Sequence, residues 1–92
     1  MIRSFRHKGL KALYVSGDRN GVRTDVVPRL IRILTLLDRV RDIQEMDIPG
    51  MRLHPLKGDL AGYWSVTVTA NWRLVLRFES GDASQVDLVD YH

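Results

Sequence analysis

The sequence has no cysteine among its 92 residues, and this absence excludes two ways of stabilising a small protein. Neither a disulfide framework nor a structural zinc site with thiolate ligands can form without cysteine. The three histidines are scattered, and no close spacing of histidines and carboxylates suits a metal ion. We therefore expect no metal and no other cofactor. A chain without disulfides is also compatible with the reducing cytoplasm, which is where we expect this protein.

Long apolar runs are absent as well. No run approaches the roughly 18 residues of a membrane span. Residues 1–11 carry four basic side chains where a secretory signal would need an apolar stretch. We therefore expect no association with a membrane. At 92 residues, of which 45% are hydrophobic, the chain is long enough for one modest core, and we expect a single domain over residues 1–92.

Acidic residues are scarce in the first half of the chain. Residues 1–41 contain ten Lys or Arg against three Asp, a net charge of +7, whereas residues 42–92 contain four Lys or Arg against eight acids, a net charge of −4. Such an arginine-rich half attracts polyanions, of which nucleic acid is the commonest large one in the cytoplasm. A solvated helix surface explains the same charge equally well, so the charge alone leaves both interpretations open.

Hydrophobic periodicity divides the chain into a helical half and a strand half. Apolar residues at spacings of three and four predict a helix over residues 7–15 and a longer one over residues 24–40. Thr24 and Asp25 are candidate N-terminal caps of the longer helix. We expect its buried face to contain Val26, Val27, Leu30, Ile31, Ile33, Leu34, Leu36 and Leu37. A short first strand is predicted over residues 2–5, and a helical turn within residues 41–50.

After Gly50 the period becomes two, which predicts four antiparallel strands over residues 51–56, 63–69, 72–79 and 83–91. The face that the helices should cover contains Trp64, Val66, Val68, Leu74, Leu76, Phe78, Val86 and Leu88. The opposite face is polar and contains Tyr63, Ser65, Thr67, Thr69, Arg73, Val75, Arg77, Asp87, Val89 and Tyr91. The predicted fold class is α+β, with an antiparallel sheet and two to three N-terminal helices packed on one face.

The polar face and the ends of its strands contain the side chains best suited to catalysis. They are His54, Lys57, Arg73, Tyr91 and His92. Arginine and lysine suit a phosphate whose charge grows in the transition state. Histidine exchanges protons near neutral pH, and tyrosine can exchange a proton or stack on a base. Together these groups could cleave RNA without a metal, by activating the ribose 2′-hydroxyl, stabilising the phosphate and protonating the departing 5′-oxygen.

Each of these residues also has a structural explanation. A histidine before a proline is often a surface strand residue, and Lys57 beside Gly58 is ordinary turn chemistry. Arg73 or Arg77 could pair with an acidic residue on a neighbouring strand, such as Asp87 or Glu79. Chain termini usually fray. His7, near the start of the first helix, has no evident chemical partner.

Three segments of the sequence resemble one known family: FRHKGLKALY, RLHPLKGDLAGYWSVTVTANWRLVLRF and the terminal DYH. Together they are similar to the HigB-type toxins, the plasmid-maintenance killer branch of the RelE-like superfamily. The resemblance implies a twisted antiparallel sheet with helices on one face. It also implies a ribosome-dependent mRNA endonuclease that cuts translated messages in the decoding site. The implied partner is a HigA-like helix-turn-helix antitoxin, through which alone the toxin would reach operator DNA.

By position, His54, Lys57, Arg73, Tyr91 and His92 correspond to the functional set of that family, with Asp90 as an orienting neighbour. Our hypothesis is that Arg73 and Lys57 stabilise the phosphate, that His92 or Tyr91 is the base, and that His54 is the acid or positions the substrate. The basic residues expected to bind RNA are Lys8, Lys11, Arg29, Arg32 and Arg77. A second hypothesis is a non-catalytic toxin on the same fold, such as an inhibitor of DNA gyrase, although a pure binder needs no proton-transfer groups.

Overall fold

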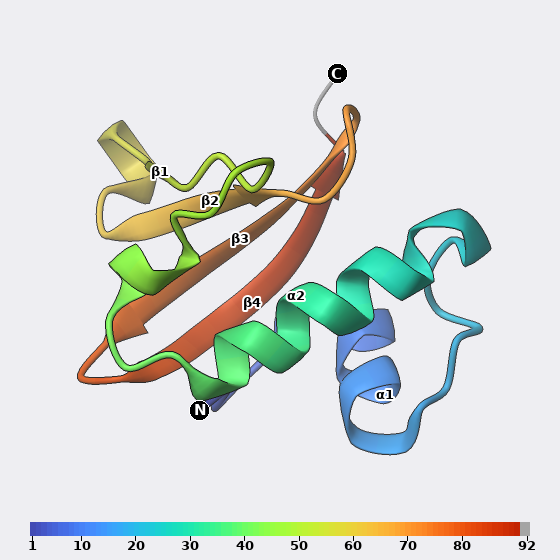
Figure 1. Ribbon diagram of the computed structural model, residues 1–92. Helices are drawn as coiled ribbons and strands as arrows, with labels where there is room; N and C mark the ends of the chain where they lie inside the picture. The colour runs from blue at the N-terminus through green and yellow to red at the C-terminus, as the bar shows by residue number, and fades with distance from the viewer. Residues whose placement is uncertain (91–92) are drawn as a thin grey trace.

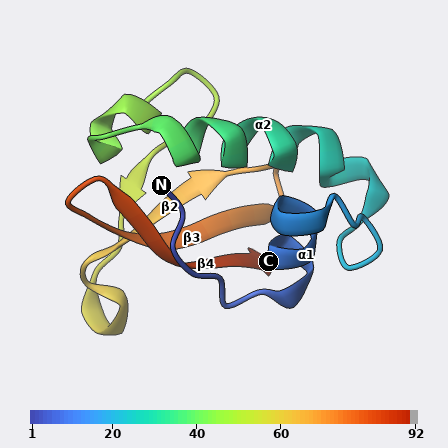
Figure 2. The ribbon, with the colours of Figure 1, turned by 90° about the horizontal axis from the view of Figure 1, so that it is seen from below.

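A four-stranded antiparallel sheet forms one layer of the protein and two helices form the other (Figure 1). The computed structural model describes residues 1–90. Its elements are α1 (Lys8–Ser16), η1 (Thr24–Val26), α2 (Val27–Arg39), η2 (Ile43–Met46), β1 (His54–Pro55), η3 (Gly58–Leu60), β2 (Tyr63–Thr67), β3 (Trp72–Glu79) and β4 (Asp82–Asp90). The strands lie in the order β1-β2-β3-β4, and Figure 2 shows α2 running along one side of this sheet. The predicted α+β class is confirmed.

The buried face of α2 is narrower than the sequence suggested. Its buried residues are Val27, Leu30, Ile33, Leu34 and Leu37, whereas Ile31 is 39% exposed. With 3.6 residues per turn, Ile31 lies about 100° around the helix from Leu30. The prediction that Ile31 is buried was wrong because the sheet covers α2 from one side only, and Ile31 lies outside the covered stripe of the helix.

The N-terminal cap of α2 also differs from the prediction. Val26 occupies the cap position and supplies no side-chain hydrogen bond, and Pro28 stands in the first turn, where its missing N–H has no intrahelical partner to lose. Thr24 and Asp25 belong to the preceding 3₁₀ turn. The Asp25 carboxylate instead accepts a hydrogen bond from Arg23 at 3.1 Å, and this bond lowers the pKa of Asp25. The side chain predicted to cap the helix is therefore occupied by a neighbouring guanidinium.

The predicted first strand over residues 2–5 is not a regular strand. Only two isolated parallel bridges form beside β4, between Ile2 and Ala83 and between Phe5 and Val86. Between these points β4 contains Gln85 at φ 54°, and its pairing with β3 shifts register there. Such a bulge interrupts a ladder of hydrogen bonds. The N-terminal segment therefore follows the edge of β4 without becoming a fifth strand.

One carboxylate ties the N-terminal segment to both helices. Asp38 accepts a hydrogen bond from the backbone N–H of Ile2 at 2.9 Å, and the Tyr14 hydroxyl also hydrogen-bonds to it. The hydroxyl bond is the main reason that the pKa of Asp38 is lowered and that of Tyr14 is raised. The charged form of Asp38 thus stabilises the folded arrangement of α1, α2 and the first residues.

We expect Asp38→Ala to reduce the free energy of unfolding by about 1–3 kcal/mol at neutral pH, because hydrogen bonds to a charged group are lost. Because the folded pKa of Asp38 is lowered, its contribution is complete above the ordinary pKa of a carboxyl and disappears as the pH falls through the folded value. Urea unfolding at neutral pH and at about pH 3 would test this. Tyr14→Phe, which removes one of the two bonds, should give a smaller loss in the same direction. An unchanged difference between wild type and Asp38→Ala on acidification would contradict the assignment.

The sheet presents its apolar residues to the helices, as its alternating pattern predicted. Buried residues of this face include Val66, Val68, Leu74, Leu76, Val86 and Leu88, while Trp64 and Phe78 are partly buried against them. The residues of opposite parity remain for the other face. Within residues 1–90, no helix is both long and apolar enough to cross a membrane.

β1 is much shorter than the predicted strand over residues 51–56. Only His54 and Pro55 pair with β2, opposite Ser65 and Trp64. Two features of the chain limit the pairing: Pro55 has no N–H to donate, and Arg52 adopts a left-handed backbone with φ 48°. The helical turn expected within residues 41–50 is present as η2, Ile43–Met46.

Candidate functional site

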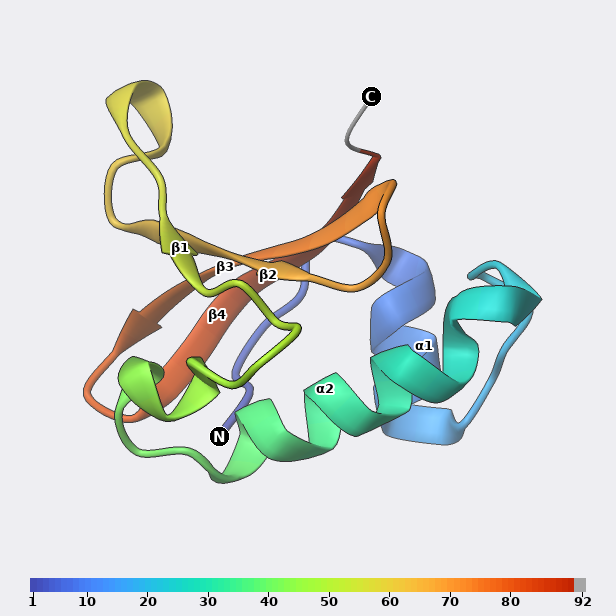
Figure 3. The same cartoon turned by 45° about the horizontal axis from the view of Figure 1, so that its top comes forward.

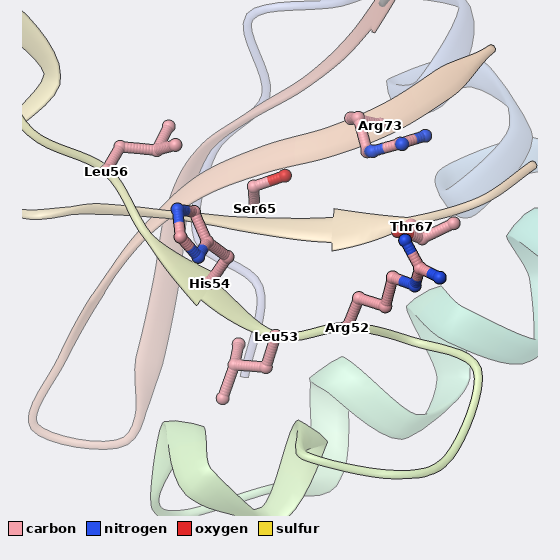
Figure 4. A pocket seen from close by; sticks show the side chains of 7 residues that line it. All are labelled: Arg52, Leu53, His54, Leu56, Ser65, Thr67 and Arg73. Carbon is pink, nitrogen blue, oxygen red and sulfur yellow. The ribbon is translucent and has the colours of Figure 1, made fainter. Parts of the chain in front are cut away.

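A cavity of about 350 Å³ lies on the polar face of the sheet, where the segment leading into β1 passes β2. Figure 4 shows its lining residues: Arg52, Leu53, His54, Leu56, Ser65, Thr67 and Arg73. Three stretches of the chain contribute them, namely residues 52–56, β2 and the start of β3. The cavity thus combines an imidazole, two guanidinium groups and two hydroxyls with a few apolar side chains.

His54 is held at the cavity by its place in β1. It pairs with Ser65 of β2, and Figure 4 shows its ring beside the Ser65 side chain. The following residue, Pro55, favours an extended backbone at His54, which directs the imidazole away from the sheet plane. The side chain is exposed, so a ligand in the cavity could reach it.

Arg73 is held by the turn between β2 and β3. Its Nη1 donates to the carbonyl oxygens of Thr69 at 2.7 Å, Ala70 at 3.2 Å and Trp72 at 3.2 Å. The residue lies opposite Thr67 in the sheet. A guanidinium oriented in this way needs little reorganisation to meet a phosphate, which is the property that makes a fixed charge effective in catalysis.

Lys57 is placed differently from His54 and Arg73. It precedes the 3₁₀ turn Gly58–Leu60 in the connection from β1 to β2, and its side chain is exposed. Figure 3 shows this connection projecting from the sheet. Lys57 does not line the cavity. The structure therefore brings His54 and Arg73 to one cavity and leaves Lys57 on the neighbouring loop.

The end of β4 lies next to the start of β3. Asp90 pairs with Trp72, and Val89 pairs with Arg73. The pKa of Arg23 is raised chiefly by its hydrogen bond with Asp25 and slightly by the charge of Asp90. Asp90 is thus close to the Arg73 end of the sheet. Tyr91 and His92, the other predicted site residues, lie outside the described part of the chain.

The five basic residues expected to bind RNA do not form one patch. Arg29 and Arg32 of α2 line a cavity of about 110 Å³ that shares Thr67 with the larger one. Arg77 lies four residues along β3 from Arg73, about 13 Å away at the rise of a strand. It stacks over the Tyr63 ring at 5.5 Å and pairs with Glu79 at 3.8 Å. Lys8 and Lys11 are exposed on α1, in the helical layer. Of these five residues, only Arg29 and Arg32 line a cavity that has a residue, Thr67, in common with the larger one.

Two residues have structural roles that the sequence alone did not reveal. His7 is the N-cap of α1, and its Nδ1 accepts a hydrogen bond from the N–H of Leu10 at 3.1 Å. Arg52, which was not among the predicted site residues, lines the cavity beside His54. Its left-handed backbone has no signature in the sequence, since glycine is the residue that usually indicates a positive φ. The one sequence signal for Arg52 is that it stands two residues before His54, which places both side chains on the same face of an extended chain.

Comparison with known structures identifies the fold. YafQ from E. coli strain BL21(DE3) is similar with a TM-score of 0.64 and 15% identity, covering 98% of this chain and 91% of YafQ. A chain of the YoeB-YefM complex from Staphylococcus aureus gives 0.60 and 19%, covering 100% and 95%. The YoeB/ParE toxin from Agrobacterium tumefaciens gives 0.56 and 21%, covering 99% and 96%. At these identities the likeness concerns the fold alone, which is RelE-like.

Comparison of sequences goes further. A protein of Proteus vulgaris named Endoribonuclease HigB is 47% identical over 92 residues, which cover 100% of both chains. The model of a family described as the RelE-like toxin of the type II toxin-antitoxin system HigB matches residues 3–92. The chain therefore belongs to the HigB-like family of RelE-like toxins of type II toxin-antitoxin systems.

Proposed function

We propose that this toxin is an endoribonuclease that cleaves mRNA during translation, without a metal, by attack of the ribose 2′-hydroxyl on the adjacent phosphate. The observation that carries the proposal is the cavity on the polar face, in which His54 and the turn-anchored Arg73 occur together. The relative that shares 47% of its residues is named an endoribonuclease. A pure binder would need no proton-transfer group such as the imidazole of His54.

Each chemical step has a candidate group. Arg73 stabilises the charge that accumulates on the phosphate as the 2′-oxygen attacks. His54 donates a proton to the 5′-oxygen as its bond to phosphorus breaks, or positions the substrate for that transfer. Tyr91 or His92 accepts the 2′-hydroxyl proton. The products are a 2′,3′-cyclic phosphate and a free 5′-hydroxyl, and no electron transfer is needed.

The remaining members of the proposed site are Lys57, Tyr91 and His92. Lys57 lies on the projecting loop one residue beyond Leu56 of the cavity lining, and RNA bound in the cavity would meet its ammonium from that side. Tyr91 and His92 follow Asp90 in the sequence, and Asp90 pairs with Trp72, the residue before Arg73. We assign Asp90 the role of an orienting neighbour.

The proposed binding partners and cellular location of the protein follow from its family and its charge. A type II toxin has an antitoxin partner, and we propose that this partner is a HigA-like helix-turn-helix protein that alone carries the toxin to operator DNA. The net charge of +7 over residues 1–41 suits contact with ribosomal RNA. Because the substrate is a translated message, the proposed location is the cytoplasm.

The test is to induce the toxin in growing cells and map the 5′ ends of transcripts. We expect new ends inside translated reading frames at a fixed position within codons, because the ribosome would hold the message in register. A matched reporter without its start codon should remain uncut. DNA damage without RNA cleavage would replace this proposal with inhibition of DNA gyrase. Equal cutting of the translated and untranslated reporters would show that the toxin is an endoribonuclease whose activity does not depend on the ribosome.

A further inference from the structure

Arg52 combines three properties that are seldom found together in a structural residue. Its backbone is left-handed, with φ 48°, a conformation that is strained for a residue other than glycine and is concentrated at functional sites. Its side chain lines the cavity. Among residues 1–90, that side chain has no hydrogen-bond or ion-pair partner. A guanidinium that lies in a cavity on a strained backbone and has no partner there is suited to bind an anion.

The backbone explains how Arg52 reaches the cavity. The carbonyl oxygen of Met51 accepts a hydrogen bond from the N–H of Thr67 at 2.7 Å, which fixes the chain against β2. The left-handed residue then turns the chain, and Figure 4 shows the Arg52 guanidinium beside Thr67. Thr67 is also the cross-strand partner of Arg73. The two guanidinium groups therefore flank Thr67 from opposite sides of β2.

The surface continues from Arg52 toward α2. The smaller cavity beside it is lined by Gly50, Met51 and Thr67 on one side and by Arg29 and Arg32 on the other. Arg29 is fixed there, because its Nη1 donates to the carbonyl oxygen of Val68 at 2.9 Å. Arg32 is exposed and has no hydrogen-bond or ion-pair partner within residues 1–90. Cationic side chains thus follow one path from Arg73 through Arg52 to Arg32.

We propose that Arg52 binds the RNA phosphate next to the one held by Arg73, and that the strand continues over Thr67 to place a further phosphate at Arg32. This inference rests on the proposed function and specifies the course of the RNA through that site. A groove that follows the backbone of a single strand with successive cations is the usual means of binding single-stranded RNA. Arg52 is then a substrate-binding residue, and the affinity for RNA depends on its side chain more than on its backbone conformation.

The experiment measures binding of a fully 2′-O-methylated RNA oligonucleotide, which cannot be cleaved because its 2′-oxygens are blocked. For a single strand the slope of log affinity against log salt changes by about 0.7 for each phosphate contact. We expect Arg52→Ala to lower the slope by that amount and to weaken binding roughly tenfold at low salt. Arg32→Ala should lower the slope by a similar amount, and the double variant by the sum. Arg19→Ala, in the exposed loop after α1, is the matched control and should leave the slope unchanged.

Two further variants separate the side chain from the backbone. Arg52→Lys retains the charge and should retain the slope. Arg52→Gly keeps the left-handed conformation without its strain, so it should melt at a higher temperature than Arg52→Ala but bind as weakly. If Arg52→Gly binds RNA as wild type does, Arg52 only shapes the chain and the proposal is overturned.

Cleavage on translating ribosomes keeps this inference distinct from the proposed function. We expect Arg52→Ala to raise the KM for the ribosome-bound message by a larger factor than it lowers kcat. The wild-type protein could cut mRNA while Arg52→Ala leaves the salt slope and the KM unchanged. This result would overturn the role of Arg52 and leave the proposed function intact. A wild-type protein that never cuts mRNA would remove the proposed function, and the oligonucleotide slopes would still decide whether Arg52 binds phosphate.

Discussion

Replacing Arg73 by Ala is expected to slow mRNA cleavage about 10²- to 10³-fold, the effect of removing one oriented charge donor from a transition state. The loss should appear in kcat, because the phosphate gains charge only as the 2′-oxygen attacks. The measurement is single-turnover cleavage of a message on translating ribosomes. Thermal unfolding must accompany it, since Arg73 also bonds to three carbonyl oxygens of the 69–72 turn.

Arg77→Ala is the matched control for this prediction. Arg77 is on the same strand and has the same parity, but it pairs with Glu79 and stacks over Tyr63 at the other end of the sheet. We expect a much smaller loss of rate than for Arg73→Ala. Equal losses for the two arginines would show that β3 contributes general positive charge and that Arg73 has no special role.

Replacing His54 by Gln is expected to slow cleavage about 10²- to 10⁴-fold, which is the usual contribution of a positioned proton donor or acceptor. Glutamine can still form hydrogen bonds from a similar position, but it cannot deliver a proton at neutral pH. Since the His54 side chain is exposed, the substitution should leave the melting temperature nearly unchanged. The same single-turnover assay measures the rate.

His7→Gln supplies the contrast for the second prediction. The His7 ring caps α1 through its bond with the N–H of Leu10, so its loss should destabilise the fold by roughly 1 kcal/mol and leave the rate of the folded protein intact. A His54→Gln variant that cuts messages at the wild-type rate would remove His54 from the chemistry. In that case the proposed site would retain only its phosphate-binding residues.

The two faces of the sheet could be assigned from sequence because the assignment depends on a local property. Side chains alternate along a strand, and the regular interchange of apolar and polar residues after Gly50 identified the core face, including Val66, Leu74 and Leu76. It also identified the face that carries Ser65, Thr67 and Arg73 beside the cavity. Neither conclusion needed knowledge of which strands are neighbours.

Local patterns were less informative where the chain departs from regular geometry. Pairing in β1 covers only His54 and Pro55, and residues 2–5 make isolated bridges. In both places a residue with positive φ contributes, Arg52 beside Pro55 in the first and Gln85 in the second. Neither is glycine or asparagine, so the sequence carries no sign of the turn. The strain is tolerated because neighbouring hydrogen bonds hold these segments in place.

The helical spacing of apolar residues in the first half and their alternation in the second were therefore enough to determine the fold class, the core face of the sheet and the presence of Arg73 on its polar face. Only the tertiary structure decided which parts of the polar face meet. It placed Arg52 and His54 across β2 from Arg73 and left Lys57 on a projecting loop. It also brought Arg29 and Arg32 of α2 to a smaller cavity that shares Thr67 with the first one. The physical reason is that the burial pattern of a strand depends on each residue and its near neighbours in sequence. The site depends instead on where a strained backbone turns the chain toward elements that are distant in sequence.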